Sequence, residues 1–415
     1  MTPAPAAPGS KPGRNPFAGL PREAAILAAV SFTVALGYGI VAPGIPAFAR
    51  QFGVSTAEAA SVISAFALVR VAFALPAGRL VDRFGSRQVM TVGIAVVAVS
   101  SVLAGFSGSF TELLVLRGAG GLGSAMFSVS AQALLLASVP GSQRGRASGL
   151  YTGGFLLGGI TGPALGGVVA AWSLRAPFFL YGALLAVPAV VAAVALRPAV
   201  RPVTARAAAS PRESLTVLAG ALRSRAYQTV AAVNFADNFA SIGIRGAIIP
   251  LFVRDSLHRS ATWTGIGFLV FAGLNAAVLL PAGRAADTLG RRPVMVAGCA
   301  ISAGGLLLLA VPPGPWPYLG ALAVAGAGSG MLDVAPSAML GDLLSAQARQ
   351  GGILVAFFQM AGDAGTVIGP VAAGLLVDTV SYPAAFALAA ALLAAAALFA
   401  LATPERGGEA TIRSG

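Results

Sequence analysis

Residues 78–90 read GRLVDRFGSRQVM, and residues 283–295 read GRAADTLGRRPVM. Both stretches place glycine, aspartate and arginine in the same order, and an apolar segment follows each of them. Only 10% of the chain is charged, so two similar charged clusters in its two halves are unusual. The repetition indicates an internal duplication, and the residues around the clusters decide which fold is duplicated.

The rest of the chain has the composition of a membrane protein. Hydrophobic residues make up 57% of its 415 positions and charged residues 10%. In soluble domains, about half of the residues are apolar and about a quarter are charged. An apolar helix of about 20 residues crosses the hydrocarbon core of a bilayer. Twelve such helices are predicted, at approximately residues 24–48, 57–79, 89–108, 110–136, 146–171, 177–196, 226–253, 262–283, 293–311, 317–340, 350–378 and 383–402.

Polar segments divide the chain into two halves. Residues 1–20 are rich in Pro, Ala and Gly without an apolar run, which is typical of a disordered tail and not of a cleaved signal peptide. The polar linker 198–225 separates residues 21–197 from residues 226–403, and residues 404–415 form a second tail. We therefore predict an all-α integral membrane protein with twelve transmembrane helices, in two six-helix bundles related by internal pseudo-symmetry.

The positive charges predict the orientation. A net charge of +13 would suggest a nucleic-acid partner in a soluble protein, but in membrane proteins Lys and Arg accumulate in cytoplasmic loops. With both termini in the cytoplasm, the predicted outer loops hold only Arg50, Arg175, Arg254 and Arg259 of the 27 Lys and Arg residues. We expect a multi-pass protein of the inner (plasma) membrane, surrounded by lipid, with cytoplasmic termini and no nucleic acid bound.

The sequence contains no pattern of an enzyme or a metal site. Cys299 lies within an apolar stretch and His258 in a predicted outer loop. No cluster of His, Cys and carboxylates has the spacing of metal ligands, and no nucleophile elbow or phosphate-binding glycine loop is present. We expect no enzymatic activity, no cofactor and no metal.

A second motif is also repeated. GGITGPALGG at residues 158–167 matches GTVIGPVAAG at residues 365–374. Both charged clusters follow the second predicted helix of their half, so they occupy the same structural position twice. Duplication of a six-helix unit is typical of secondary transporters, whose substrate site lies between the halves near mid-membrane.

These motifs resemble the major facilitator superfamily, and specifically its twelve-helix drug:proton antiporter branch. The resemblance extends from about residue 24 to residue 402. It is carried by the loop after helix 2, by LVLRGAGGLGSA (residues 114–125) in helix 4, by GGITGPALGG in helix 5, and by LGYGIVAPGIPAF (residues 36–48) in helix 1. The matching residues are Gly78, Asp82, Arg83, Gly85 and Arg87; Arg117, Gly121 and Gly123; Gly158, Gly162, Pro163, Gly166 and Gly167; and Gly37, Pro43 and Pro46.

The resemblance implies that the charged clusters form a conformational latch, which closes the cytoplasmic side when the transporter faces outward. Gly78 would allow a close helix approach, and Asp82 can accept hydrogen bonds at the positive N-terminus of a facing helix, which is helix 11 in the family. Alternatively, the arginines only follow the bias of positive charge toward the inner side. The predicted latch residues are Gly78, Asp82, Arg83, Gly85, Arg87, Gly283, Asp287 and Arg291.

The glycines of helix 5 recur every four residues, from Gly154 through Gly158 and Gly162 to Gly166. They therefore line one face and permit close backbone contact, and Pro163 adds a kink. The resemblance favours antiport over uptake. The alternative is ordinary helix packing without a role in transport.

Ionisable residues within the predicted helices are candidates for the site, because a charge at membrane depth is costly. They are Arg70, Arg117, Asp237, Arg245, Asp333 and Asp363. On helix 7, Asn234, Asn238 and Ser241 are predicted to share a polar stripe with Asp237 and Arg245; Gln359 and Thr366 do so with Asp363 on helix 11. Such stripes face a wet cavity or another helix, and each acid could instead pair structurally with Arg70, Arg117 or Arg245.

Helix 1 has no acid and offers only Ser31, Thr33 and Tyr38, unlike helix 1 of many drug antiporters. We therefore predict that proton coupling runs through Asp237, Asp333 or Asp363. The segment GMLDVAPSAMLGDL around Asp333 is also similar to helix 10 of the vesicular amine transporters. The predicted substrate and proton site comprises Asp237, Asp333, Asp363, Arg70, Arg117, Asn234, Asn238, Arg245, Gln359 and Tyr38.

The sequence thus predicts a monomeric, proton-coupled secondary transporter that exports small amphipathic molecules by alternating access. The sequence contains no nucleotide-binding motif, so we do not expect ATP to be the direct energy source. A proton-coupled importer or exporter of sugars or other metabolites remains an alternative. A membrane sensor that transports nothing is an alternative of another class.

Overall fold

The predicted apolar stretches fold as membrane-length helices. The computed structural model describes residues 21–139, 143–195, 223–311, 314–345 and 351–403, and no strand occurs within these ranges. Most of the predicted linker and both predicted tails lie outside the described residues. Eleven of the described helical segments are long and apolar enough to span a bilayer. The remaining pass, the ninth, begins with two arginines that lower its mean hydropathy.

The elements alternate in direction through two groups of six passes. The first group contains α1 (Arg22–Val41), α2 (Gly44–Ala49), η1 (Arg50–Phe52), α3 (Thr56–Phe84), α4 (Ser86–Phe106), α5 (Phe110–Ser138), α6 (Arg144–Trp172) and α7 (Ala176–Ala195). The second group contains α9 (Arg225–Asn238), η3 (Phe239–Ile248), α10 (Ile249–Asp255), α11 (Ala261–Thr288), α12 (Arg291–Leu308), α13 (Pro315–Leu332), α14 (Ala335–Ser345), α15 (Gly351–Thr379) and α16 (Tyr382–Leu401).

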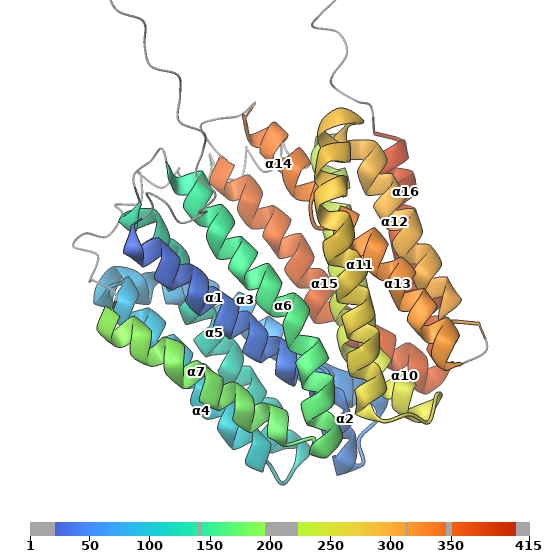
Figure 1. The fold of residues 1–415 in the computed structure, drawn as a ribbon, viewed down its shortest axis with the longest axis horizontal. Coiled ribbons are helices and arrows are strands. Elements are labelled where there is room, and N and C mark those ends of the chain that lie inside the picture. Colours follow the sequence, from blue (N-terminus) through green and yellow to red (C-terminus); the bar gives the residue numbers. More distant parts are fainter. Residues whose placement is uncertain (1–20, 140–142, 196–222, 312–313, 346–350, 404–415) are drawn as a thin grey trace, which may run out of the picture.

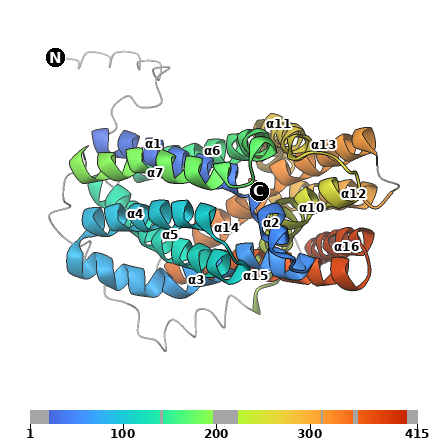
Figure 2. The same ribbon diagram turned by 90° about the horizontal axis from the view of Figure 1, so that it is seen from below.

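The two groups form two bundles that lie side by side (Figures 1 and 2). We call the end where α1 begins and α16 ends the terminal end, and the end that carries α2 and α10 the far end. Contacts between the bundles come mainly from α3 with α15 and from α6 with α11. In Figure 1, α6 and α11 diverge toward the terminal end and meet near the far end. The predicted fold of two six-helix bundles is confirmed.

Three passes that the sequence predicts as continuous helices are interrupted. The first breaks after Val41, next to Pro43, and the tenth breaks at Asp333, shortly before Pro336. Proline has no N–H to donate and restricts the residue before it, so a helix tends to break there. The seventh pass changes to a wider π-helix at Phe239–Ile248. The three predicted spans are thus present as membrane-length passes, but each is built from more than one helical segment.

Glycine seams hold the same pair of passes together in each bundle. The seam of α6 packs on α1, where Gly154, Gly158, Gly162 and Gly166 lie against the carbonyl groups of Ala28, Phe32, Leu36 and Ile40. In the second bundle, Gly365 and Gly369 of α15 lie against the backbone of α9 and η3. The predicted close backbone contact is present, because a side chain at any of these glycines would overlap the facing helix.

The repeated charged clusters also make equivalent contacts. Arg87 at the start of α4 donates a hydrogen bond to the Ala193 carbonyl near the end of α7. Arg292 at the start of α12 donates one to the Leu401 carbonyl at the end of α16. Unpaired carbonyls at a helix C-terminus carry partial negative charge, so arginine is a favourable partner. One part of the repeat therefore joins the third and sixth passes within each bundle.

The outer surface of both bundles is apolar. Leu280 and Val194, for example, are 75% and 77% exposed, and Trp172 and Trp316 are exposed at the far end. An extensive exposed apolar surface is expected of a protein in contact with lipid. Together with the membrane-length helices, it identifies a multi-pass membrane protein.

Candidate functional site

The bundles touch closely at the far end. Gly167 of α6 lies against Gly265 of α11, where a side chain at Gly265 would approach the Gly167 Cα within 3.0 Å. Gly374 of α15 lies against Ala57 of α3 in the same way, because a side chain at Gly374 would approach the Ala57 Cα within 2.6 Å. Gly167 and Gly374 are the last glycines of the two repeated motifs, so the pseudo-symmetry of the chain places two matching backbone contacts at this end.

The predicted latch at the terminal end is not formed in this structure. No atom lies within 4 Å of the position that a side chain at Gly78 would occupy. Asp82 is exposed and makes no hydrogen bond or ion pair among the described residues. The prediction of a close helix contact at Gly78 is therefore wrong for this conformation, because no other element lies next to Gly78.

The other residues of the predicted latch act within their own bundles. Gly85 turns the chain between passes at a φ of 85°, as does Gly290, which is not among the predicted latch residues, at a φ of 100° in the second half; glycine adopts such angles without steric cost. Arg291 pairs with Asp287 and, at 3.3 Å, with Asp342. The guanidinium of Arg83 lies 5.2 Å from the ring centroid of Phe84. Gly283 faces only Val334 of its own bundle.

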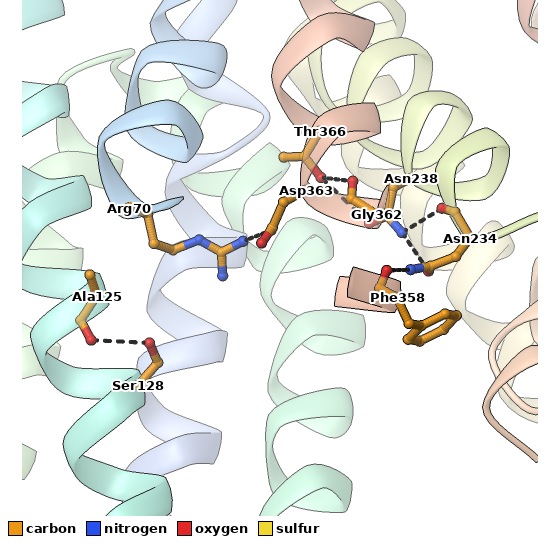
Figure 3. Close-up of polar contacts among 9 residues, drawn as sticks. All are labelled: Arg70, Ala125, Ser128, Asn234, Asn238, Phe358, Gly362, Asp363 and Thr366. Atoms are coloured by element: carbon orange, nitrogen blue, oxygen red, sulfur yellow. Dashed lines mark hydrogen bonds and ion pairs between the residues drawn. The ribbon is translucent and has the colours of Figure 1, made fainter. Parts of the chain in front are cut away.

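An ion pair joins the bundles at membrane depth. Arg70 of α3 reaches across to Asp363 of α15, with 2.5 Å between Nη2 and Oδ1 (Figure 3). The two side chains are 36% and 28% exposed, so both contact solvent in part. Of the pairings that the sequence left open, the structure selects Arg70 for Asp363. Gln359, one turn earlier on α15, is exposed and makes no hydrogen bond among the described residues.

The asparagines of α9 face α15. Asn234 Nδ2 donates to the Phe358 carbonyl at 2.7 Å, and Asn238 Nδ2 donates to Asn234 at 2.9 and 3.0 Å (Figure 3). A side chain at Gly362 would meet both amides. These amides therefore join two helices of one bundle.

Asp237 belongs to a different face of the same pass. With Ser241 and Arg245 it lines a small pocket of about 20 Å³ among the helices of the second bundle, whose other lining residues lie on η3, α10, α11, α12 and α13; the pocket has room for about one water molecule. Neighbouring residues on a helix point about 100° apart, so Asp237 and Asn238 cannot share one line. The prediction of a single polar stripe on helix 7 is wrong: the stripe divides between α15 and the inside of the second bundle.

Opposite charges lie near each other around this cavity without a direct ion pair. Asp237 is within electrostatic range of Arg245 and Asp333, yet no ion pair joins them among the described residues. Arg245 stacks over Phe271, at 4.5 Å from its ring centroid, and its buried Nε has no hydrogen-bond partner. The cavity is therefore lined by a carboxylate and a guanidinium that make no direct ion pair.

Asp333 lies at the break between α13 and α14, and the residue is exposed. Its carboxylate accepts a hydrogen bond of 2.7 Å from Asn275 of α11. Asn275 itself is buried, and its Oδ1 has no partner. Sequence reasoning missed Asn275; a lone amide in an otherwise apolar stretch was the available signal.

Arg117 is held apart from all three acids. It is 1% exposed, and none of its three guanidinium nitrogens has a hydrogen-bond partner. Its guanidinium lies 4.7 Å from the ring centroid of Phe66. The ring centroids of Phe66 and Tyr38 are 5.5 Å apart. Tyr38 is also within electrostatic range of both Arg117 and Arg245. The first bundle thus carries a buried cation shielded by aromatic rings.

Two further observations limit the candidate sites. No group of three or more His, Cys, Asp or Glu side chains suited to a metal occurs among the described residues. A larger hollow of about 430 Å³ opens between α12 and α16, next to Arg292 and Leu401, away from the contact between the bundles. The candidate site is therefore the group of ionisable residues at Arg70–Asp363 and at Asp237, Arg245 and Asp333.

Comparisons with known proteins place this arrangement in a family. The sequence profile of the Major Facilitator Superfamily matches residues 27–243 and 230–414. An uncharacterized MFS-type transporter of Methanocaldococcus jannaschii, MJ1560, is 23% identical over 84% of this chain and 89% of its own length. The MFS-type transporter YceJ of Bacillus subtilis is 28% identical over 68% of this chain and 71% of its own length.

The quinolone resistance protein NorA of Staphylococcus aureus is 28% identical over a shorter region, 37% of this chain and 39% of NorA. Among solved structures, the nucleoside transporter NupG superposes with a TM-score of 0.73 at 13% identity, over 92% of this chain and all of NupG. A bacterial homologue of the human lysosomal transporter Spinster superposes with a TM-score of 0.72 at 14% identity, over 91% and 94% of the two chains. These two structures share the fold of this chain.

Proposed function

Since this chain belongs to the major facilitator superfamily and is a membrane transporter, not an enzyme, we propose that it exports small amphipathic molecules in exchange for protons by alternating access. It acts as a monomer in the plasma membrane. The excess of Lys and Arg in the loops of the terminal end makes that end cytoplasmic. The structure, closed at the far end, is then the inward-facing state.

The observation that carries this proposal is the ion pair between Arg70 and Asp363. It is the place where a titratable group at membrane depth bridges the two bodies that must move relative to each other. Protonation of Asp363 removes its charge and weakens the bridge, so proton binding and bundle movement share one contact. A mid-membrane carboxylate that is paired and partly solvated is typical of a proton pathway.

Asp333 and Asp237 extend this site into the second bundle. Asp333 is exposed at a helix break, as in other secondary transporters whose sites lie at broken helices. Asp237 lies behind it, in the small cavity with Arg245. We assign Asp333 to proton and substrate exchange, and Asp237 to a partly buried position that responds to the charge of Asp333.

Export of apolar or amphipathic compounds is supported by two observations. The partial similarity to NorA concerns a protein named for quinolone resistance. The described helices also place aromatic rings, such as Tyr38 and Phe66, beside the buried cation Arg117. Aromatic faces bind apolar and cationic molecules, whereas sugars need many polar side chains.

The test is export from bacterial cells that lack their own exporters. We expect expression of the chain to lower the accumulation of several amphipathic compounds, and we expect a protonophore to abolish this effect. The matched control is Asp255→Asn, which removes a carboxylate that accepts a bond from Tyr382 at the far end within the second bundle. Proton-driven accumulation of a compound inside the cells would favour the importer, and an absence of any flux in purified vesicles would favour the sensor.

A further inference from the structure

The N-terminus of α3 is capped from the opposite bundle. A helix begins with backbone N–H groups that have no partner inside the helix. In α3, Ser55 and Glu58 satisfy two of them in a capping box: Ser55 Oγ accepts from Glu58 N at 3.2 Å, and Glu58 Oε2 accepts from Ser55 N at 2.7 Å. The N–H groups of Thr56 and Ala57 remain.

Asp378 of α15 takes both of the remaining donors. Its Oδ1 accepts from Thr56 N at 2.9 Å, and its Oδ2 accepts from Ala57 N at 2.7 Å. All four donors at the start of α3 are therefore satisfied, two of them by a carboxylate from the other bundle. The positive end of the helix dipole adds to this attraction, and Gly374, one turn earlier on α15, allows the close approach to Ala57.

The equivalent position in the other repeat has no such group. When GGITGPALGG is aligned with GTVIGPVAAG, Gly167 corresponds to Gly374, and Ala171 therefore corresponds to Asp378. Gly167 packs against Gly265 near the start of α11, whose N-cap residue Ser260 makes no side-chain capping bond. The pseudo-symmetry supplies two backbone contacts at the far end, but only one of them carries a charge.

The two ends of the pair α3–α15 also differ. Asp82, at the terminal end of α3, is exposed and unpaired among the described residues, whereas Asp378, at the far end of α15, is engaged. Each helix of the pair thus ends in an acid, and in this conformation only the acid of the closed end is bonded. Separation of the bundles at the far end would expose the N–H groups of Thr56 and Ala57 to water.

We propose that Asp378 is a gating residue that holds the far end shut by capping α3 across the bundle interface, and releases it when the transporter opens to the other side. This inference rests on the proposed alternating access and adds a positioning residue to it. Because Asp378 is exposed, water competes for its carboxylate. Loss of the charge should then change the ratio of open to closed far ends by about three- to tenfold, as for other charged caps.

The experiment measures distances between spin labels in full-length protein in lipid nanodiscs. Gln51→Cys and His258→Cys report on the far end, and Gln88→Cys and Thr288→Cys report on the terminal end; all four residues are exposed or lie in loops. The native Cys299 is buried, and protein with Cys299 alone gives the background. Asp378→Asn should raise the open fraction of the far end three- to tenfold, Asp378→Glu should restore part of the wild-type ratio, and Asp255→Asn should leave it unchanged.

Protection of Cys299 from thiol reagents shows that each variant is folded. If the wild type exchanges between two far-end distances and Asp378→Asn has the same ratio of open to closed far ends, Asp378 is not a gating residue, while alternating access stands. If the wild type keeps one distance at each end at every pH and with every transported compound, alternating access itself is refuted, and the gating role of Asp378 with it. An equal effect of Asp255→Asn would also overturn the proposal, because the change would then reflect any lost carboxylate at this end.

Discussion

The glycine seam between α6 and α1 allows a test in which two neighbouring residues should respond with opposite signs. A methyl group at Gly158 would lie 2.7 Å from Leu36 N and 3.0 Å from Ala35 Cβ, and closer still to the Phe32 carbonyl. A methyl group at Gly159 would have no atom of another element within 4 Å. Gly158→Ala must therefore push two helices apart, whereas Gly159→Ala meets open space.

The magnitudes follow from packing and from helix propensity. Overpacking of a close contact costs about 1–3 kcal/mol, whereas replacing an unhindered helical glycine by alanine stabilises by about 0.5–1 kcal/mol. The two variants should differ by about 1.5–4 kcal/mol in stability. In a protein of this size, 1 kcal/mol shifts Tm by roughly 1–2 °C, so Gly158→Ala should lower Tm by about 1–6 °C and Gly159→Ala should raise it slightly.

The buried Cys299 supplies the assay. Because it is the one cysteine of the chain and is fully buried, a thiol-reactive fluorophore reports unfolding as the detergent-solubilised protein is heated. Equal Tm values for the two alanine variants would show that the α6–α1 contact is looser than the structure indicates. A fall for Gly159→Ala alone would place the contact on the wrong face of α6.

Three further predictions concern the charged residues. Replacing either member of the pair Arg70–Asp363 alone leaves one charge without its partner at membrane depth, so Arg70→Met and Asp363→Asn should each lower Tm more than the double variant, with a coupling of about 1–2 kcal/mol; losses of stability that simply add would contradict the pairing. Arg292→Ala removes the cap from the end of α16, so hydrogen exchange of the last turn, up to Leu401, should accelerate while the core of the helix stays protected; unchanged exchange would refute the cap. Arg117→Met removes a buried charge that has no hydrogen-bond partner, so Tm should rise while transport falls; a lower Tm would show that Arg117 stabilises the bundle.

The sequence predicts the architecture well because the relevant signals are local. Twelve apolar stretches and two repeated motifs suffice for two bundles of six helices, since each helix satisfies its own backbone hydrogen bonds in lipid. The glycines at every fourth position likewise predict the seam of α6. The breaks next to Pro43 and Pro336 could also have been read from the sequence, because proline acts on its own helix.

The pairings between distant helices could not be predicted. The sequence indicated that Asp363 needs a partner or a wet cavity, but the choice of Arg70 depends on how α3 and α15 cross. The stripe on the seventh pass failed for a related reason: Asp237 and Asn238 are consecutive, and only the packing of the neighbouring helices shows which of them faces α15. Asp378 was overlooked because an acid at a helix end usually has no partner.

The central claim is that protons are exchanged at the acids of the second bundle, and proton-driven flux in proteoliposomes tests it most directly. Flux is measured in two ways: as accumulation driven by an imposed pH gradient, and as exchange of labelled for unlabelled compound without a gradient. The variants are Asp237→Asn, Asp333→Asn and Asp363→Asn, with Asp255→Asn as the control. We predict that Asp333→Asn and Asp363→Asn lose gradient-driven accumulation while the exchange persists, and that Asp255→Asn behaves as the wild type. Undiminished gradient-driven flux in all three variants of the site would contradict the account.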